Sequence, residues 1–355
     1  MASAIPFFRF LKKNIRHKPL SGELCTMKFL VIQTAFIGDV VLATALIEKI
    51  HRFFPEADIH FLLRKGNESL LKDHPLVTKT LIWDKKQHKY KKLWDMLWQI
   101  RRERYDYLLN CQRFGASGLL TVLSGARHTV GFDKNPLSRW FSRRVPHQMG
   151  KGASRFGLPW IHEVDRNLSL LDHLTDTSPE KPKLYPTEQD WGTIAPLAAV
   201  KPYVCMAPTS VWFTKQWPAG AWIELILKIP ADHTIYILGA PGDAEVCDYI
   251  VAVSQRDKVV NLAGKIALPA SAALMQGAVM NYVNDSAPLH LASAMNAPVT
   301  AVFCSTVPEF GFTPLSDNTT IWQTRESLDC RPCGLHGYKA CPKGHFKCSN
   351  IQIEV

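Results

Sequence analysis

The sequence predicts an α/β protein made of two Rossmann-like, doubly wound domains that face each other across a cleft. Three observations lead to this prediction. Short apolar segments alternate with segments of helical periodicity along most of the chain. The alternation stops once, in a Pro-rich stretch over residues 176–200, and then starts again. The length of 355 residues also suits two domains of ordinary size.

The alternation begins at Lys28. Residues 29–33 form a short apolar run typical of a strand, Gly38 interrupts the pattern, and apolar residues then recur at helical spacing up to Ile50. The elements expected next are a strand at 59–63, further segments at 70–73 and 81–83, a helix around 93–103 and a strand at 107–110. Strands and helices in regular succession predict a parallel sheet.

The second half of the chain repeats this pattern after residue 201. The expected strands cover residues 203–207, 234–238, 258–261, 279–283 and 299–303. The expected helices cover residues 218–228, 244–253 and 269–276, with another from Pro288. A second parallel sheet with its own helices is therefore predicted.

These patterns divide the chain into five parts. They are a basic extension over 1–27, an N-terminal domain over 28–175, a linker over 176–200, a C-terminal domain over 201–329 and a Cys-rich tail over 330–355. The extension is either a basic amphipathic membrane anchor or a leader that precedes a true start at Met27. No apolar stretch is long enough to span a membrane, and the extension lacks the residue order of a secretory signal, so the protein is expected to be cytoplasmic.

Basic residues are concentrated in the first part of the chain. Residues 1–150 contain 26 Lys and Arg against 12 Asp and Glu, a net charge of +14, whereas residues 151–355 carry a net charge of −3. This polarity favours contact with a polyanion such as a nucleic acid, an anionic membrane surface or a phosphorylated glycan. A basic surface that only confers solubility is the plain alternative.

The first candidate site is the turn at residues 34–39, between the first strand and the first helix. In an open parallel sheet such a turn lies at the carboxyl ends of the strands, where ligands bind, and Gly38 lets the backbone turn tightly. The turn lacks the glycine pattern of a dinucleotide site, which argues against a nicotinamide cofactor. Asp39 is a candidate catalytic residue, although Asp is a good helix N-cap and a carboxylate at this position more often caps the helix.

The second candidate site is the segment 207–218, again between a strand and a helix. Thr209, Ser210 and Lys215 precede the helix start and would suit a diphosphate, because a helix N-terminus presents free N–H groups and a partial positive charge. The spacing is not that of a Walker loop. A surface loop with Pro218 in the first helical position is the structural alternative.

The third candidate site follows the expected strand 279–283 and reads Asn284-Asp285-Ser286-Ala287-Pro288-Leu289-His290. Asp285 and Ser286 can cap a helix, so capping alone explains them acceptably. Their position at a second strand end in the same half as Lys215 favours a shared ligand site. A lone His on a mixed helix face is more often a packing or hydrogen-bonding residue than a base, and His290 is interpreted in that way.

The tail contains four of the nine cysteines, at Cys330, Cys333, Cys341 and Cys348, interleaved with two histidines. This density suits a structural zinc ion, and the first pair has the spacing of zinc ligands. Reduced thiols packed in a terminal loop explain the cluster as well. Disulfides are disfavoured in a cytoplasmic chain. Cys25, Cys111, Cys205, Cys247 and Cys304 are scattered and are expected mostly in the core.

Taken together, the segments 36–41, 214–218 and 284–292 resemble glycosyltransferase family 9, the ADP-heptose:lipopolysaccharide heptosyltransferases. The resemblance extends from about Lys28 to the end of the chain. It implies a GT-B fold, with the acceptor mainly on the N-terminal domain and the nucleotide sugar mainly on the C-terminal one. It also implies inverting transfer of a heptose from ADP-heptose to a phosphorylated lipid A–Kdo core at the cytoplasmic face of the inner membrane.

The resemblance assigns a role to each motif. Asp39 matches the family's general base, and Lys215 would neutralise the departing diphosphate, so that no metal cofactor is required. Asp285 would hydrogen-bond the donor sugar. The other residues expected at the donor are Thr209, Ser210, Gly239, Ser286, Ala287 and His290.

A polyanionic acceptor agrees with the basic N-terminal half. The residues expected at the acceptor are Gly38 and the arginines that could hold phosphates and carboxylates, Arg64, Arg113, Arg127, Arg143 and Arg144. Two features depart from the family. Pro241 stands near the place where heptosyltransferases carry a donor-contacting Glu, and the basic extension before Lys28 is atypical.

Two other functions fit parts of the sequence. A family 9 transferase that uses another nucleotide sugar fits all three motifs. It also fits Pro241, which stands near the place of the family's donor-contacting Glu. A non-catalytic nucleic-acid or membrane-binding protein with a zinc-bearing tail fits the charge distribution. No recognition helix or single-strand module with interleaved basic residues is apparent, however, so a nucleic-acid partner is not expected.

Overall fold

The computed structural model describes residues 26–85 and 89–354. The predicted extension over 1–27 therefore lies almost wholly outside the described residues. The chain divides into two compact units. The N-terminal unit contains the described residues up to Gln148 and the segment Arg166–Glu180, and the C-terminal unit contains Met149–Asp165 and the described residues from Lys181 onwards.

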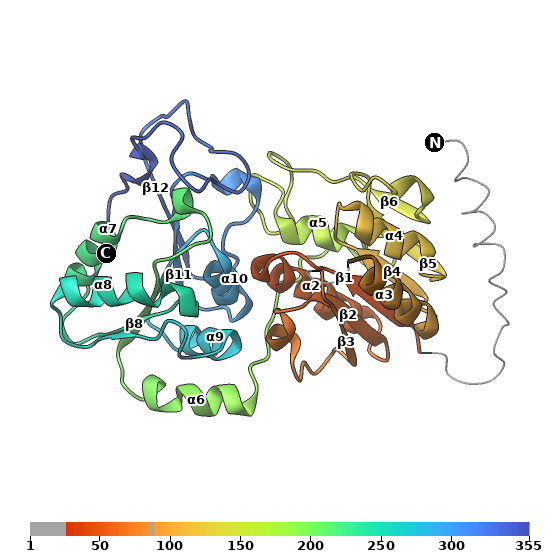
Figure 1. The fold of residues 1–355 in the computed structure, drawn as a ribbon, viewed down its shortest axis with the longest axis horizontal. Helices are drawn as coiled ribbons and strands as arrows, with labels where there is room; N and C mark the ends of the chain where they lie inside the picture. Colours follow the sequence, from red (N-terminus) through yellow and green to blue (C-terminus); the bar gives the residue numbers. More distant parts are fainter. Residues whose placement is uncertain (1–25, 86–88, 355) are drawn as a thin grey trace. The chain divides into compact units, whose positions relative to one another are not determined.

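The N-terminal unit is built on one six-stranded parallel sheet (Figure 1). Its strands are β1 (Lys28–Ile32), β2 (Asp58–Arg64), β3 (Lys79–Trp83), β4 (Tyr107–Asn110), β5 (His128–Phe132) and β6 (Arg143–Val145). They are arranged in the order β3-β2-β1-β4-β5-β6, and every neighbouring pair is parallel. This order is that of a doubly wound sheet, and its direction of winding reverses between β1 and β4.

Helices cover this sheet because each crossover between parallel strands has to return over a face. The helices are α2 (Ile37–Phe53), α3 (Lys89–Glu103), α4 (Gly115–Leu123) and the short α5 (Glu163–Ser169), which runs from one unit into the other. Helix α2 buries every residue from Val40 to Ile47. One face of α3 joins the core through Met96, Leu97 and Ile100, which pack with residues of β1 and β4.

The C-terminal unit repeats the architecture. Its strands are β7 (Tyr203–Ala207), β8 (Thr234–Ile237), β9 (Val259–Asn261), β10 (Asn281–Asn284), β11 (Val299–Phe303) and β12 (Thr319–Gln323). The order β12-β11-β10-β7-β8-β9 is the same doubly wound order, and all neighbouring pairs are parallel. The winding reverses between β7 and β10. The predicted pair of Rossmann-like domains is confirmed.

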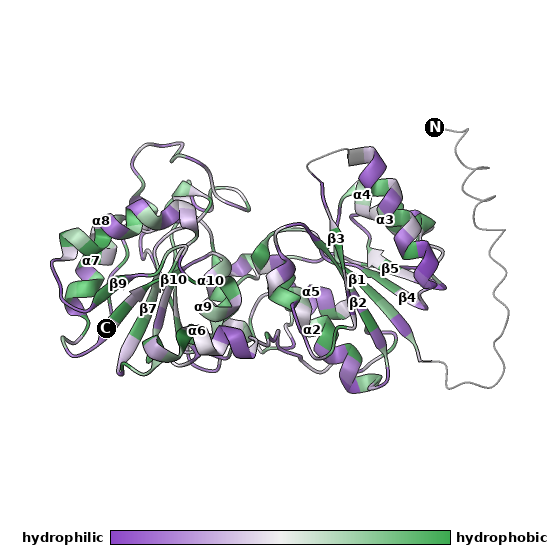
Figure 2. Ribbon diagram, turned by 60° about the horizontal axis from the view of Figure 1, so that its bottom comes forward, coloured by the Kyte–Doolittle hydropathy of each residue, from purple (hydrophilic) through white to green (hydrophobic). Residues whose placement is uncertain are grey.

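The helices of this unit are α6 (Glu188–Ala198), α7 (Ala219–Lys228), α8 (Ala244–Ser254), α9 (Leu268–Gln276) and α10 (Ala287–Ala294). The core lies between them and the sheet, and Figure 2 shows that the strands of both sheets carry much of the hydrophobic colouring. Trp217 and Trp222 pack edge to face at the centre of this core, with ring centroids 5.3 Å apart. None of the helices in the described residues combines the length and the apolar content of a membrane span.

The main difference from the prediction lies in the expected linker, where the structure has a helix. Helix α6 occupies residues 188–198, contacts α9 and belongs to the C-terminal unit. Thr187 starts it through a capping box, because its hydroxyl accepts from the Asp190 amide at 3.2 Å and Asp190 accepts from the Thr187 amide at 2.8 Å. The many prolines of residues 176–200 led to the prediction of a linker, so the capping box at Thr187 was not recognised as a helix start.

Smaller differences concern strands. The predicted strand 279–283 is shifted to Asn281–Asn284, since Val279 is exposed and lies before the sheet. Residues 70–73 are not a sheet element, because Glu68–Leu71 form a 3₁₀ turn. The periodicity of the chain did not predict β5, β6, β12 or α4.

Candidate active site

The fold places the predicted motifs at the two positions where the winding of the sheets reverses. In a doubly wound sheet the two strands at this position send their helices to opposite faces, which leaves a crevice at their carboxyl ends. Lys215 follows β7 and Asp285 follows β10, the two strands at the reversal in the C-terminal unit. In the N-terminal unit, Asp39 follows β1 at the corresponding position.

Lys215 and Asp285 form an ion pair in this crevice. The Lys215 Nζ lies 2.6 Å from Asp285 Oδ2, and the side chains are only 15% and 6% exposed. Thr306, just after β11, donates from Oγ1 to the same carboxylate oxygen at 2.6 Å. A buried ion pair of this kind presents a cation that can turn to an anionic ligand and a carboxylate that can accept from hydroxyl groups. The structure thus brings together two of the predicted site residues.

The loop that carries Lys215 is held in place by another loop of the same unit. Lys215 ends a short 3₁₀ turn, Phe213–Lys215, and α7 begins four residues later. The Asn284 side chain, fully buried at the end of β10, accepts from the Trp217 amide at 3.0 Å. This bond ties the loop after β7 to the loop after β10, so Lys215 and Asp285 are positioned by the same link.

The tail closes over the same loop. Thr214 and Tyr338 are bonded in both directions, because the Tyr338 amide donates to Thr214 Oγ1 at 2.8 Å and the Thr214 amide donates to the Tyr338 carbonyl at 3.1 Å. Gly337 has a φ of +78°, and a Cβ there would lie 2.9 Å from Thr214 Oγ1 and 3.0 Å from Lys215 Cγ. The tail backbone therefore packs directly on the stem of Lys215.

A second contact fixes the tail to the end of β11. The Arg331 guanidinium donates to the carbonyls of Phe303, Cys304 and Thr306 at 3.2, 2.8 and 2.8 Å. It thus holds the segment that carries Thr306 against Asp285. Arg331 is a positioning residue for the ion pair.

The third motif begins α10, as predicted. Ser286 is its N-cap and Ala287 its first residue, so the amides of this turn are available to an anion. His290 lies one turn further on, is 5% exposed and packs edge to face against Phe312. Its Nδ1 has no hydrogen-bond partner among the residues that the structure describes. This burial agrees with the interpretation of His290 as a packing residue rather than a base.

Burial lowers the pKa of His290 to about 3. The charge of Asp285 raises this pKa in part, whereas the nearby His162 and Lys215 lower it further. Because the folded pKa lies below the unfolded value, the stabilisation is present above about pH 6.5 and is lost as the pH falls towards 3. At pH 5 the wild type should have lost ~2 kcal/mol of unfolding free energy through His290. Urea unfolding at pH 7 and pH 5 should show a smaller loss for His290→Asn.

The exposed His128 supplies the control for this experiment. His128→Asn should keep the pH dependence of the wild type. An identical loss of stability in wild type and His290→Asn would show that His290 does not carry the acid sensitivity.

The other predicted donor residues lie at the same edge of the C-terminal sheet. Thr209 and Ser210 are half-buried in the loop after β7, and Gly239 follows β8, the neighbour of β7. The Gly239 carbonyl accepts from the Gly264 amide at 2.9 Å. A Cβ at Gly239 would approach the Asp243 Cβ to 3.0 Å, so the backbone there is closely packed.

In the N-terminal unit, Asp39 lies in the first turn of α2 and is half-buried. Its Oδ2 accepts from the Phe36 amide at 3.1 Å, so the carboxylate caps the helix, which is the structural alternative that the sequence left open. Capping occupies one oxygen and also fixes the direction of the other. The capping role and a role as a base are therefore compatible.

Cations surround the Asp39 turn. The Arg64 guanidinium lies over the Phe36 ring, 4.9 Å from its centroid. The Lys85 amine donates to Thr34 Oγ1 at 2.7 Å and to the Thr34 carbonyl at 3.1 Å. Burial of the amine, with a smaller effect from Arg64, lowers the pKa of Lys85 to about 8. Lys85 was not among the predicted residues, although its place after a strand end could have indicated it.

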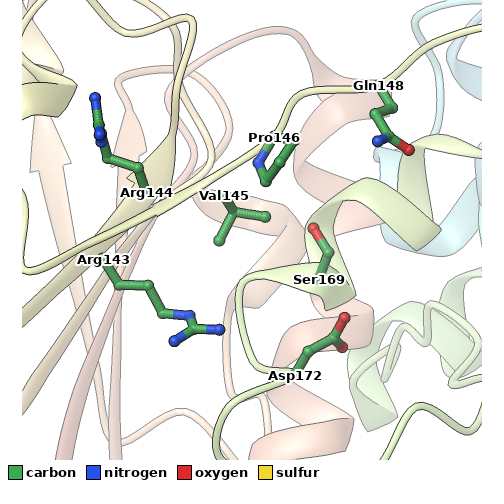
Figure 3. Close-up of a pocket in the computed structure, with 7 residues that line it drawn as sticks. All are labelled: Arg143, Arg144, Val145, Pro146, Gln148, Ser169 and Asp172. Atoms are coloured by element: carbon green, nitrogen blue, oxygen red, sulfur yellow. The ribbon is translucent and has the colours of Figure 1, made fainter.

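The remaining predicted arginines do not all gather at that turn. Arg113 follows β4 at the same edge, whereas Arg127 is exposed and pairs with Asp106 at 3.4 Å. Arg143 and Arg144 lie on β6 beside a cavity of about 270 Å³, lined also by Val145, Pro146, Gln148, Ser169 and Asp172. Figure 3 shows Arg143 pointing toward Asp172 and Arg144 pointing away from it. Of this pair, only Arg143 points toward the Asp172 side of the cavity.

The four tail cysteines form no disulfide with any residue in the described part of the chain. Cys333 and Cys348 are buried, and Cys348 packs in the core beside Trp217. Within residues 26–85 and 89–354, no three His, Cys, Asp or Glu side chains are grouped so that they could hold a metal ion. Zinc binding stays a prediction, which elemental analysis of protein purified without added metal would test.

Several residues that build the site were not among the predicted site residues. Asn284, Thr306, Arg331 and Gly337 all act by holding Lys215 and Asp285 in place. Thr306 could have been found by the rule that polar residues after parallel strands line a shared edge. The contacts of Arg331 and Gly337 bridge large separations along the chain, and no local pattern indicates them.

Comparison with known proteins shows similarity in sequence over most of the chain. A family model described as "Glycosyltransferase family 9 (heptosyltransferase)" matches residues 93–336. Lipopolysaccharide heptosyltransferase 3 of Escherichia coli strain K12 is 26% identical over 284 residues, which cover 76% of this chain and 80% of the relative.

Two solved structures of Escherichia coli proteins share the fold. ADP-heptose lps heptosyltransferase II is 20% identical with a TM-score of 0.71 and covers 91% of this chain and 98% of its own. Heptosyltransferase WaaC with ADP is 18% identical with a TM-score of 0.64 and covers 83% of this chain and 90% of its own. The fold is GT-B, as predicted.

Proposed function

The chain belongs to glycosyltransferase family 9, and on that premise we propose that it transfers a heptose from ADP-heptose to the lipopolysaccharide inner core with inversion at the anomeric carbon. A glycosyltransferase of this family is an enzyme, so the non-catalytic alternative is set aside. The observation that carries the proposal is the Lys215–Asp285 ion pair at the point where the C-terminal sheet reverses its winding.

The donor assignment rests on the chemistry of that pair. A nucleoside diphosphate sugar offers two phosphates to a cation and hydroxyl groups to a carboxylate. Lys215 takes the diphosphate together with the amides at the start of α10, and Asp285 accepts from a sugar hydroxyl. The solved structure of a family relative with ADP supports adenosine as the nucleoside.

Asp39 is the proposed general base. In a single displacement the acceptor hydroxyl loses its proton to Asp39 as its oxygen forms a bond to the anomeric carbon, and the bond from that carbon to the diphosphate oxygen breaks. Lys215 and the helix amides neutralise the charge that develops on the leaving diphosphate. No resident metal takes part in these steps.

The acceptor is an anionic, lipid-linked glycan in this proposal. The cations Arg64 and Lys85 beside the Asp39 turn support it, as does the cavity into which Arg143 points. Because the acceptor carries lipid chains, the enzyme works at the cytoplasmic face of the inner membrane as a peripheral protein.

Titration calorimetry with ADP, UDP and GDP on wild type and Lys215→Ala tests the donor. The proposal expects ADP to bind most tightly and to lose affinity in the variant. If UDP or GDP binds best, the alternative of another nucleotide sugar replaces ADP-heptose, in keeping with Pro241 at the place of the family's donor-contacting Glu. If no nucleotide binds to the wild type, the proposal of a nucleotide-sugar donor fails.

Gly337→Ala tests whether the tail positions Lys215. The new methyl group would displace the Lys215 stem, because the Cβ would lie 3.0 Å from its Cγ. We expect the affinity for ADP to fall about tenfold while the affinity for AMP, which lacks the second phosphate, changes less than about twofold. Calorimetry with both nucleotides measures this ratio.

Gly344→Ala is the matched control for the tail. Gly344 has a similar φ of +70°, so both variants carry the same backbone strain, but no atom lies within 4 Å of its Cβ position. Gly344→Ala should keep the wild-type ratio of ADP to AMP affinity. If Gly337→Ala lowers the affinities for ADP and AMP by the same factor, the tail supports only the fold of the loop.

A further inference from the structure

Helix α3 exposes a line of large aromatic side chains. Tyr90, Trp94 and Trp98 are 77%, 47% and 58% exposed. A spacing of four residues places them one above another along one flank of the helix. The adjacent face of the helix packs into the core through Met96, Leu97 and Ile100. The aromatic line is therefore an outer surface, and the helix that carries it is firmly anchored.

Basic side chains accompany the aromatic line. Lys91 and Arg102 are exposed on the same side of the helix, at positions three and four residues from Trp94 and Trp98. The Arg101 guanidinium lies 5.7 Å from the Trp98 ring centroid and donates to the Leu123 carbonyl at 2.6 Å, which fixes that ring beside α4. We define this set of residues, Tyr90, Lys91, Trp94, Trp98 and Arg102, as the aromatic face.

The two acidic residues of α3 offset the positive charge of its basic residues only in part. Glu103 is occupied by Lys28 and Lys79 at 2.9 and 2.6 Å, and the hydrogen bonds from these lysines lower its pKa to about 2. Asp95, the other acidic residue of the helix, is exposed beside Lys91 and Arg102 and offsets one of these two charges, while Arg101 adds a further cation at Trp98. The aromatic face thus combines exposed rings with net positive charge.

The aromatic face begins at the edge of the sheet that holds Asp39. Helices α2, α3 and α4 each follow a strand of one parallel sheet, so all three start at its carboxyl edge. Phe36 and Phe114, the N-caps of α2 and α4, are exposed aromatic residues at that edge. A surface bound along α3 would therefore reach the edge where the Asp39 carboxylate lies.

We propose that the aromatic face docks on an anionic lipid bilayer. Trp and Tyr rings have an apolar body and a polar N–H or O–H group, which suits the headgroup region of a membrane, and neighbouring lysines pair with anionic lipids. The anchored inner face keeps α3 flat on the surface, so only the rings enter the headgroup layer. The inference deepens the proposed function, on which the choice of a lipid partner rests, because a lipid-linked acceptor has to be reached at a membrane.

Sedimentation of the full chain with vesicles tests the proposal. Wild type should pellet with phosphatidylcholine vesicles that contain phosphatidylglycerol and remain in solution with pure phosphatidylcholine. Tyr90→Ser/Trp94→Ser/Trp98→Ser should lower the partition coefficient about tenfold or more. Lys91→Glu/Arg102→Glu keeps the rings and should also reduce binding. Both variants should have the far-UV circular dichroism and the urea unfolding curve of the wild type, because the five replaced side chains lie outside the core.

Helix α8 provides a matched control. Its exposed Val246, Tyr249 and Val253 lie at similar helical spacing, but the exposed acidic residues Glu245 and Asp248 accompany them. Val246→Ser/Tyr249→Ser/Val253→Ser should leave vesicle binding unchanged. The inference is overturned if the α3 triple variant binds vesicles as the wild type does, or if the α8 variant loses as much binding.

Binding of a fluorescent single-stranded DNA distinguishes a nucleic acid from a lipid surface as the partner. Loss of DNA binding in the α3 triple variant, with vesicle binding retained, would assign the aromatic face to nucleic acid and overturn the lipid proposal. Because vesicle sedimentation requires neither donor nor acceptor, it succeeds or fails independently of the nucleotide titrations that test the proposed function.

Discussion

Replacing Asp39 by Asn is expected to lower the rate of sugar transfer by about 10³-fold while the affinity for ADP stays within about twofold of the wild type. The amide oxygen can still accept from the Phe36 amide, so α2 keeps its cap, but the side chain can no longer take a proton. Product nucleotide released per minute measures the rate, and calorimetry measures ADP affinity.

Asp190→Asn is the control for this prediction. Asp190 occupies the same third position of its helix and accepts from the N-cap amide of Thr187 at 2.8 Å, and it lies on α6, away from all predicted site residues in sequence. Its replacement should leave the transfer rate unchanged. A rate in Asp39→Asn within about tenfold of the wild type would assign proton removal to another group.

Lys215→Met is expected to weaken ADP binding by about 100-fold and AMP binding by less than about threefold, because a charged hydrogen bond to the second phosphate is lost. The same variant leaves the Asp285 carboxylate buried without its cation, while the Thr306 hydroxyl still donates to it. Breaking a buried ion pair from one side should lower the free energy of unfolding by ~3 kcal/mol.

A double variant separates the two effects. Lys215→Met/Asp285→Asn removes both charges and should recover most of the lost stability, because no uncompensated charge remains buried. ADP affinity should stay low. If the double variant regains ADP affinity together with stability, Lys215 supports the fold of the loop and does not contact the diphosphate.

The sequence predicted the elements of this fold better than their arrangement. Strands such as β7 and β11 are uniformly buried and appear as continuous apolar runs, which periodicity detects. Strand β6 has three residues, of which Arg143 and Arg144 are exposed, so no apolar pattern marks it. Strand order depends on pairing between distant parts of the chain, which no local pattern encodes.

For the candidate site, too, the sequence predicted the residues better than the contacts between them. Lys215 and Asp285 could be predicted because each follows a strand of a parallel sheet, and this rule places polar loop residues at one edge. Their ion pair could not be predicted, because it depends on β7 and β10 being neighbours in the sheet although β8 and β9 come between them in the sequence. The burial of His290 likewise depends on Phe312, which no local pattern connects to it.

The contact between Thr214 and Tyr338 also has a consequence for biosynthesis. The two residues are 124 positions apart, so the ribosome completes β7 and the loop after it long before the segment that packs on that loop has been made. The sheet of the C-terminal unit can form during translation, whereas the Lys215 loop reaches its final position only after Gly337 and Tyr338 have left the exit tunnel. If Lys215 binds the nucleotide as proposed, nascent chains arrested before that point would have the strands of this sheet but would not yet bind nucleotide.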